Sequence, residues 1–278
     1  MIKTAYLTDT GRKRELNEDY VYASEKPVGN LPNLFIVADG MGGHNAGDFA
    51  SDFTVKTIVE EVEASFEKNP SIIFEKAINV ANRKLREIAA EDTSKRGMGT
   101  TVVAATCMGK YLQVANVGDS RLYIVNDTIK QVTTDHSYVE EMIRRGSLQR
   151  ENARSNPNKN IITRAVGAKN EVQVDIYVME LKPGDLILMC SDGLSNMLED
   201  EEMRMIIKRQ RDIIEMAEQL VKAANDNGGK DNISVVLIDD NTDYNSPKLA
   251  EILFLPLYFL FSMKKYAPCV TSFYASID

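Results

Sequence analysis

Four aspartates in the sequence lie at the ends of apolar segments, where a rigid backbone can hold a carboxylate at the edge of a sheet. Three follow such segments and one precedes the last: Asp39, Asp119, Asp192 and Asp231. A strand end fixes a side chain while leaving it open to a ligand. An Asp-Gly pair, present at two of these positions, is also a common turn. The repetition of the pattern favours a shared site over a set of unrelated turns.

Carboxylates that converge on one point repel one another unless a cation compensates for their charge. Oxygen ligands select hard ions, so such a cluster would hold Mg²⁺ or Mn²⁺ in preference to zinc. The sequence contains only two histidines, His44 and His136, which argues against a zinc site or a Ser-His-Asp hydrolase. It also lacks the G-x-S-x-G elbow of serine hydrolases and the G-x-x-x-x-G-K-[ST] phosphate loop.

Two further segments carry groups that suit a phosphate or a metal ion. Three glycines within residues 40–43 would let the backbone come close to a ligand and offer it a carbonyl oxygen. A helix predicted from residue 46 would point its positive end at the same place. Arg14 can bind a phosphate through two hydrogen bonds, and Glu18 and Asp19 add carboxylates nearby. Each segment alone would also fit an ordinary turn.

The composition is that of a soluble globular protein of 278 residues, with 44% hydrophobic residues and a net charge of −8. Such an acidic chain suits nucleic acid poorly, because phosphate backbones require clustered Lys and Arg. The three cysteines are widely spaced and predict neither a disulfide framework nor a zinc site. The first residues contain no apolar run typical of a signal peptide. We therefore expect a cytoplasmic protein with no nucleic-acid partner.

Hydropathy patterns predict strands and helices throughout residues 1–240. The predicted strands cover residues 34–38, 101–107, 111–117, 121–125, 172–179, 185–190 and 233–238. The predicted helices cover residues 46–66, 70–90, 137–145, 200–208 and 212–224. Asn69 and Asp212 are expected to cap two of these helices. Hairpin-linked strands and paired helices predict a layered α+β fold, since a parallel sheet would need alternating βαβ units.

Two segments differ from this pattern. Residues 135–164 are polar and predict one short helix beside a mobile loop. Residues 241–278 are expected to form a separate C-terminal tail, in which residues 252–263 carry no charge. About 20 apolar residues are needed to cross a bilayer, so this run is too short. The interpretations of the tail are disorder, a segment foreign to the domain, a docking segment and an interfacial anchor, and membrane contact is not expected.

In their order along the chain, the polar motifs resemble those of the metal-dependent protein phosphatase family, also called protein phosphatase 2C, in its bacterial form. The motifs are Asp9-x-Gly11-x-x-Arg14-x-x-Asn17-Glu18-Asp19, Asp39-Gly40-Met41-Gly42-Gly43-His44, Gly99-Thr100-Thr101, Val117-Gly118-Asp119-Ser120-Arg121, Asp135-His136-Ser137, Ser191-Asp192-Gly193 and Gly228-Gly229-x-Asp231-Asn232. Each motif is weak alone, but their common order is not expected by chance. The resemblance covers residues 1–240 and implies a phosphatase domain with a four-layer α-β-β-α sandwich.

The resemblance also implies a site for two Mn²⁺ or Mg²⁺ ions. Asp39 would bridge the ions, Asp192 and Asp231 would bind the first, and the Gly40 carbonyl would bind the second. Asp119 would join Asp192 in a weaker third site.

Further roles implied by the resemblance concern water and phosphate. Glu18 and Asp19 would hold metal-bound waters, Glu18 as part of the metal site and Asp19 as a catalytic residue. Arg14 would bind the phosphate, and residues 135–164 would correspond to a mobile flap.

The implied activity is hydrolysis of phosphoserine and phosphothreonine in proteins by a hydroxide that bridges the two metals. Its partners would be phosphoproteins and a bacterial Ser/Thr kinase that it opposes in signal transduction, and it would act as a monomer. Met41 stands where eukaryotic relatives place a histidine, which leaves His44 or a metal-bound water as the acid. A catalytically idle binding domain and a phosphatase for small phosphoesters are the alternatives. Retention of every metal position favours the enzyme.

Overall fold

Two antiparallel sheets make up the centre of the computed structural model, which describes residues 2–42 and 46–240. The first sheet has the strand order β1 (Ile2–Asp9), β11 (Ile233–Asp240), β10 (Leu186–Cys190), β7 (Arg121–Val125) and β8 (Ile129–Gln131). The second has the order β2 (Asp19–Ser24), β3 (Leu34–Met41), β5 (Val102–Met108), β6 (Tyr111–Val117) and β9 (Asp175–Glu180), and β4 (Gly99–Thr100) pairs with β3.

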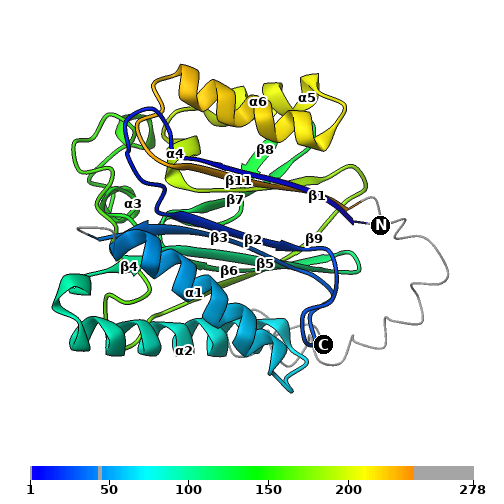
Figure 1. The fold of residues 1–278 in the computed structure, drawn as a ribbon. Coiled ribbons are helices and arrows are strands. Elements are labelled where there is room, and N and C mark those ends of the chain that lie inside the picture. Colours follow the sequence, from blue (N-terminus) through cyan, green and yellow to red (C-terminus); the bar gives the residue numbers. More distant parts are fainter. Residues whose placement is uncertain (1, 43–45, 241–278) are drawn as a thin grey trace, which may run out of the picture. The chain divides into compact units, whose positions relative to one another are not determined.

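Helices cover the outer face of each sheet (Figure 1). The second sheet packs against α1 (Ala46–Glu63) and α2 (Pro70–Glu91), and the first against α5 (Asp200–Arg209) and α6 (Ile213–Asp226). The short helices α3 (Tyr138–Arg144) and α4 (Asp192–Ser195), with the 3₁₀ turns η1 (Thr93–Lys95) and η2 (Arg150–Asn152), complete the described elements. The arrangement confirms the predicted α+β class and its four-layer α-β-β-α sandwich.

The alternation of side chains along a strand explains why the central strands read as continuous apolar runs. In β3, Leu34 and Ile36 belong to the cluster under α1 and α2, whereas Phe35 is equally buried on the opposite face. Successive side chains of a strand point to opposite faces, so a strand covered on both sides needs apolar residues at every position. A second apolar cluster joins β10 and β11 to α5 and α6.

The helix boundaries follow from local capping groups. The Asn69 side chain accepts a hydrogen bond from Ser71 N at 3.0 Å, and Pro70 occupies the first turn, as predicted. Asp212 caps α6 by accepting from Ile214 N at 2.8 Å, which confirms the second predicted cap. The helix predicted over residues 46–66 ends earlier, at Glu63.

Several of the observed strands are not predicted by the sequence patterns. The strands β1 and β2 have many half-exposed residues, and β1 lies at a sheet edge, so neither has a continuous apolar run. The short strands β4 and β8 were also missed. The strand predicted from residue 172 begins at Asp175. The predicted tail, residues 241–278, lies outside the described residues. Among those described, no helix is long and apolar enough to cross a membrane.

Candidate active site

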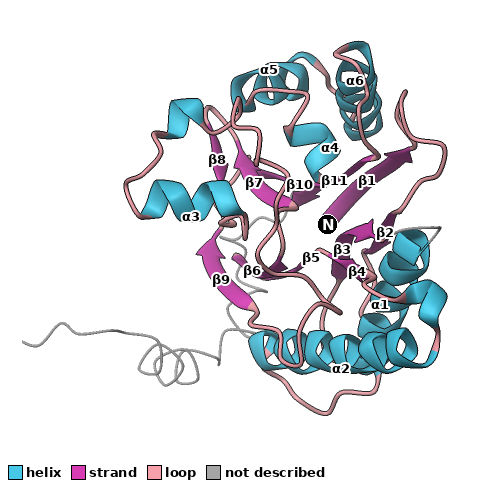
Figure 2. Cartoon of the chain, turned by 90° about the vertical axis from the view of Figure 1, so that its left-hand side faces the viewer, coloured by secondary structure: helices cyan, strands magenta, loops and turns pink. Residues whose placement is uncertain are grey.

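The aspartates singled out in the sequence come from both sheets and meet at one end of the sandwich. Asp19 and Asp39 are direct partners across the β2–β3 ladder of the second sheet. Asp192 follows β10 as the first residue of α4, and Asp231 lies just before β11, two strands that pair in the first sheet. Asp119 lies in the turn between β6 and β7. Figure 2 views the fold from the end where α3, α4 and β4 lie.

The pKa shifts show that these carboxyls lie within electrostatic range of one another. Burial raises the pKa of Asp39 well above its usual range, and Asp19, Asp192, Asp119 and Asp231 raise it further. Burial and its acidic neighbours raise the pKa of Asp19 to about 7 and that of Asp192 to about 6. Proton sharing is favoured because like charges in a buried cluster cannot all remain ionised without compensation. The structure therefore brings the predicted carboxylates together.

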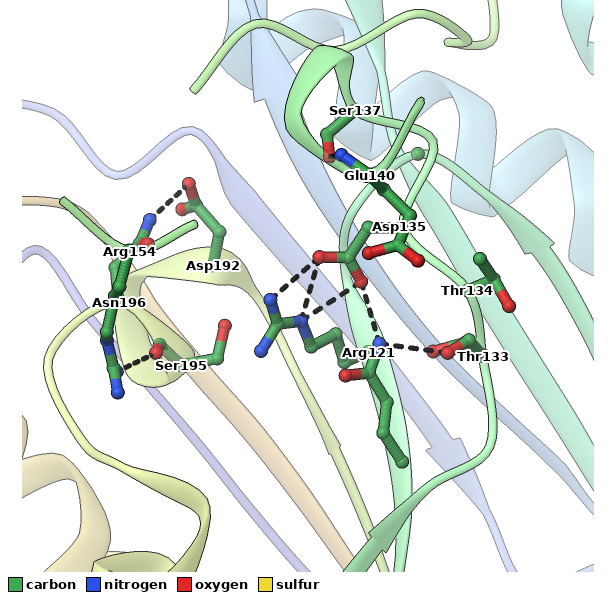
Figure 3. A network of polar contacts seen from close by, with 12 residues as sticks. Arg121, Thr133, Thr134, Asp135, Ser137, Glu140, Arg154, Asp192, Ser195 and Asn196 are labelled. Atoms are coloured by element: carbon green, nitrogen blue, oxygen red, sulfur yellow. Dashed lines mark hydrogen bonds and ion pairs between the residues drawn. The ribbon is translucent and has the colours of Figure 1, made fainter. Parts of the chain in front are cut away.

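Asp119 lies at the side of this cluster that faces residues 135–164. Burial raises the pKa of the Asp119 carboxyl, and Asp192 and Asp135 raise it further against the opposing charge of Arg121. The Asp135 carboxylate holds the Arg121 guanidinium, with Nη2 to Oδ2 at 2.7 Å (Figure 3). Arg121 Nη1 also donates to the Tyr123 hydroxyl at 2.9 Å. A fixed positive charge thus lies beside the carboxylates, a role that the sequence analysis did not assign.

Two buried polar side chains that the sequence analysis gave no role hold the carboxylate-bearing segments. The Ser191 hydroxyl donates to Asp19 Oδ2 at 2.7 Å, while Asp19 Oδ1 is buried without a hydrogen-bond partner among the described residues. The Asn232 amide donates to the carbonyls of Thr10 and Leu16, each at 2.9 Å, and its oxygen accepts from Glu18 N at 2.9 Å. Asn232 therefore ties residues 10–18 to the start of β11.

Arg14 lies at the rim of the cluster, and its side chain is 47% exposed. Its Nη2 donates to Asp231 Oδ2 at 2.9 Å, and Nη1 is 3.8 Å from Glu18 Oε2. Burial would lower the pKa of Arg14, but the hydrogen bond and charge of Asp231, together with the charges of Glu18 and Asp39, raise it overall. Burial raises the pKa of Glu18 against the opposing effect of Arg14. An exposed guanidinium beside buried carboxylates is suited to receiving a phosphate.

Gly40, directly after Asp39, permits close packing of the backbone at the end of β3. A Cβ atom added at Gly40 would lie 2.0 Å from Gly47 O and 2.5 Å from Glu18 O. A Cβ atom at Gly47 would lie 2.4 Å from Glu18 Oε1. These contacts place Glu18 between the end of β3 and the first turn of α1. The predicted acid, His44, lies outside the described residues.

The other histidine is part of the scaffold. His136 is buried, and its Nδ1 accepts a hydrogen bond from Gly118 N at 3.0 Å. Its Nε2 lies 3.0 Å from Asp175 Oδ2. With Nδ1 as an acceptor, the ring proton lies on Nε2 and is donated to Asp175. His136 therefore holds the turn before β7 against β9.

The donor set fits hard divalent ions. The oxygens come from carboxylates, and Asp19 Oδ1 has no hydrogen-bond partner in the described part of the chain. The raised pKa values of Asp19 and Asp39 indicate negative charge without enough compensation. In residues 2–42 and 46–240, no three Asp, Glu, His or Cys side chains already form a metal-binding group. The two observations agree, because Coulomb repulsion between carboxylates acts over several ångströms and keeps them apart. A bound ion would draw each ligand oxygen to about 2.0–2.6 Å from itself.

Stacked antiparallel sheets with outer helix pairs, and a carboxylate cluster beside an exposed arginine, define an α-β-β-α sandwich phosphatase. The family profile described as Protein phosphatase 2C matches residues 10–237. The serine/threonine phosphatase Stp of Listeria innocua is 39% identical over 249 residues, covering 85% of this chain and 95% of its own. The chain therefore belongs to the protein phosphatase 2C family and is a protein-serine/threonine phosphatase.

Solved structures agree with this assignment. The serine/threonine phosphatase Stp1 from Staphylococcus aureus superposes with a TM-score of 0.81 at 33% identity, covering 87% of this chain and 96% of its own. The catalytic domain of the phosphatase PstP in complex with two manganese ions superposes with a TM-score of 0.76 at 30% identity, covering 86% of this chain and 97% of its own.

Proposed function

We propose that this phosphatase hydrolyses phosphoserine and phosphothreonine in proteins by direct attack of water, using two divalent ions held by its carboxylate cluster. The observation that carries the proposal is the convergence of buried carboxylates from both sheets beside Arg14. The two manganese ions of the related PstP structure support a dinuclear site.

Within this proposal, the carboxylates bind different ions. Asp39 would hold both ions, Asp192 and Asp231 would hold the first, and the Gly40 carbonyl would hold the second. Asp119, with Asp192, would provide a weaker third position. When bound, Mn²⁺ or Mg²⁺ neutralises the cluster and lowers the pKa of a water molecule toward neutrality.

The remaining side chains orient water and phosphate. Asp19 Oδ1, buried and unpartnered in the described structure, is free to accept a proton from water while Ser191 holds the other carboxylate oxygen. Glu18 orients a second water. Arg14 turns from Asp231 to the phosphate oxygens and stabilises the charge that develops on them.

The leaving oxygen needs a proton, for which His44 and a bound water remain the two candidates. His44→Ala would lower turnover more for alkyl than for aryl phosphates, because aryl leaving groups need less protonation. Equal losses on both substrates would exclude His44 as the acid.

The physiological partners would be phosphoproteins and the Ser/Thr kinase whose action this phosphatase reverses. The support is the family assignment and the Ser/Thr phosphatase names of its relatives. Deletion of the gene should raise phosphothreonine on that kinase and its substrates, as measured by phosphoproteomics. Unchanged phosphothreonine levels would contradict the pairing.

The central experiment compares phosphate release from a phosphothreonine peptide in EDTA, Mg²⁺ and Mn²⁺. We expect activity only with a divalent ion, and Asp192→Asn should lower it by about a hundredfold or more, because it removes a metal ligand. Asp226→Asn is the matched control, since Asp226 is exposed on α6 and pairs only with Lys222 there. Full activity of the Asp192→Asn enzyme would refute the site.

A further inference from the structure

Residues 135–164, the flap segment, are closed at their base by backbone contacts between the two ends of the segment. Ser137 pairs with Ile162 in an isolated β-bridge, and Thr163 N donates to His136 O at 2.7 Å. Beyond this base, the segment contains α3, η2 and a series of turns. Most side-chain hydrogen bonds of residues 138–161 stay within the segment, such as that from Arg150 to Glu140 at 2.7 Å.

Arg154 is the exception in the outer part of the flap segment. Its Nη2 donates to the carbonyl oxygens of Ser195 and Leu198, and its Nη1 forms an ion pair with the Glu199 carboxylate. In the described part of residues 146–160, no other side chain forms a hydrogen bond or ion pair with the body. The planar guanidinium thus bridges three groups at the end of α4 and in the α4–α5 connection, and Figure 3 shows its contact with Ser195.

The groups that Arg154 contacts belong to a firmly held part of the body. Asn196 N donates to Asp192 O at 2.7 Å, and Asn196 Nδ2 donates to Asp192 Oδ2 at 2.8 Å. These two hydrogen bonds tie the end of α4 to Asp192, the candidate metal ligand. A Cβ atom added at Gly193 would lie 1.9 Å from Asn232 O, which shows how closely α4 packs against β11. Leu198 is almost fully buried. Arg154 therefore joins the flap segment to a rigid anchor beside the cluster.

We propose that Arg154 is a positioning residue that clips the flap segment to the α4–α5 connection, next to the candidate metal ligand Asp192, and so holds the segment beside the active site. The inference rests on the proposed function, because the ligand that it serves is a phosphorylated protein segment. A phosphopeptide extends beyond the phosphate and reaches the flap, whereas a small aryl phosphate does not. The clip should therefore matter for peptide substrates and not for the chemistry itself.

The test uses the full chain with Arg154→Ala, and Arg154→Lys as the conservative variant. Amide hydrogen exchange of residues 150–161 should become roughly tenfold faster in Arg154→Ala, because a hydrogen bond to a charged group contributes about that factor to local stability. Exchange in α2 should not change. KM for a phosphothreonine peptide should rise several-fold while kinetics on p-nitrophenyl phosphate stay close to wild type. The exchange rate and the peptide KM of Arg154→Lys should lie between those of wild type and of Arg154→Ala, because lysine keeps the charge but not the planar guanidinium.

Arg150→Ala is the matched control, because Arg150 lies in the same segment and its ion pair with Glu140 stays inside it. It should leave both the exchange and the KM ratio unchanged. Exchange in Arg154→Ala equal to wild type would refute the clip, and faster exchange with an unchanged KM ratio would refute its role in substrate placement. An inactive wild-type chain would refute the proposed function and the substrate part of this inference, whereas the exchange measurement still tests the contact.

Discussion

The stability of the protein in EDTA should fall as the pH rises from about 5 to about 8. Burial raises the pKa of the Asp19 carboxyl from 3.8 to about 7, with Asp192 and Asp231 adding to the shift against hydrogen bonds from Ser191 and Ser234. Because the folded chain binds this proton more tightly than the unfolded chain, the stabilisation is complete below the unfolded pKa. It is lost as the pH rises through the folded pKa.

The magnitude follows from the two pKa values of the Asp19 carboxyl. The full difference corresponds to a free energy on the order of 4 kcal/mol, of which about 3 kcal/mol falls between pH 5 and 8. For a domain of this size, each kcal/mol shifts the melting temperature by about 2–4 °C, so we expect a fall of roughly 5–10 °C. Asp192, whose pKa is raised to about 6, acts in the same direction. The exposed Asp92 has a pKa lowered to about 2 and titrates below this range.

The assay is thermal unfolding followed by circular dichroism in EDTA at several pH values. Asp19→Asn should flatten the pH dependence, because the amide keeps an acceptor for Ser191 without a titrating proton. Asp226→Asn, on the surface of α6, should keep the wild-type slope. Excess Mn²⁺ should reduce the slope by compensating for the cluster's charge. A wild-type melting temperature that is constant or rises between pH 5 and 8 in EDTA would refute the reasoning.

Two further substitutions test how the site is packed and how it binds phosphate. Gly40→Ala would force a Cβ atom against Gly47 O and Glu18 O, and we expect urea unfolding to show a loss of about 3 kcal/mol; Gly184→Ala, in an open turn with positive φ, should lose only about 1 kcal/mol. Equal losses would contradict the packing argument. Arg14→Ala should raise KM for a phosphothreonine peptide several-fold. It should not weaken Mn²⁺ binding in calorimetry, since Arg14 donates a hydrogen bond to Asp231 and its removal leaves that carboxylate free for the ion. An unchanged KM would show that Arg14 does not bind the phosphate and is only a surface charge.

The sequence was most informative where burial is complete on both faces of a strand. The strands β3, β10 and β11 are almost entirely buried, so their apolar runs identify them without tertiary information. The half-exposed edge strand β1 has no such run, because one side of it meets solvent. Its place in the sheet depends on pairing with β11, which is more than 200 residues away in the sequence, and no local pattern indicates that pairing.

The candidate site shows the same division. The location of Asp39 and Asp192 at the ends of apolar runs predicted their convergence, because Asp39 lies near the end of β3 and Asp192 comes shortly after β10. The hydrogen bond from Ser191 to Asp19 joins residues 172 positions apart, and no local pattern announces it. The contact of Arg154 with the α4–α5 connection was equally hidden, because it depends on how a polar segment folds back over the body.

The central claim is that buried carboxylates from the two sheets hold a pair of hard divalent ions. Anomalous diffraction from crystals grown with Mn²⁺ tests it most directly. The account predicts two manganese peaks bridged by the Asp39 carboxylate, with Asp192 and Asp231 on one of them. Manganese bound elsewhere, or an Asp39 carboxylate that touches neither ion, would contradict it.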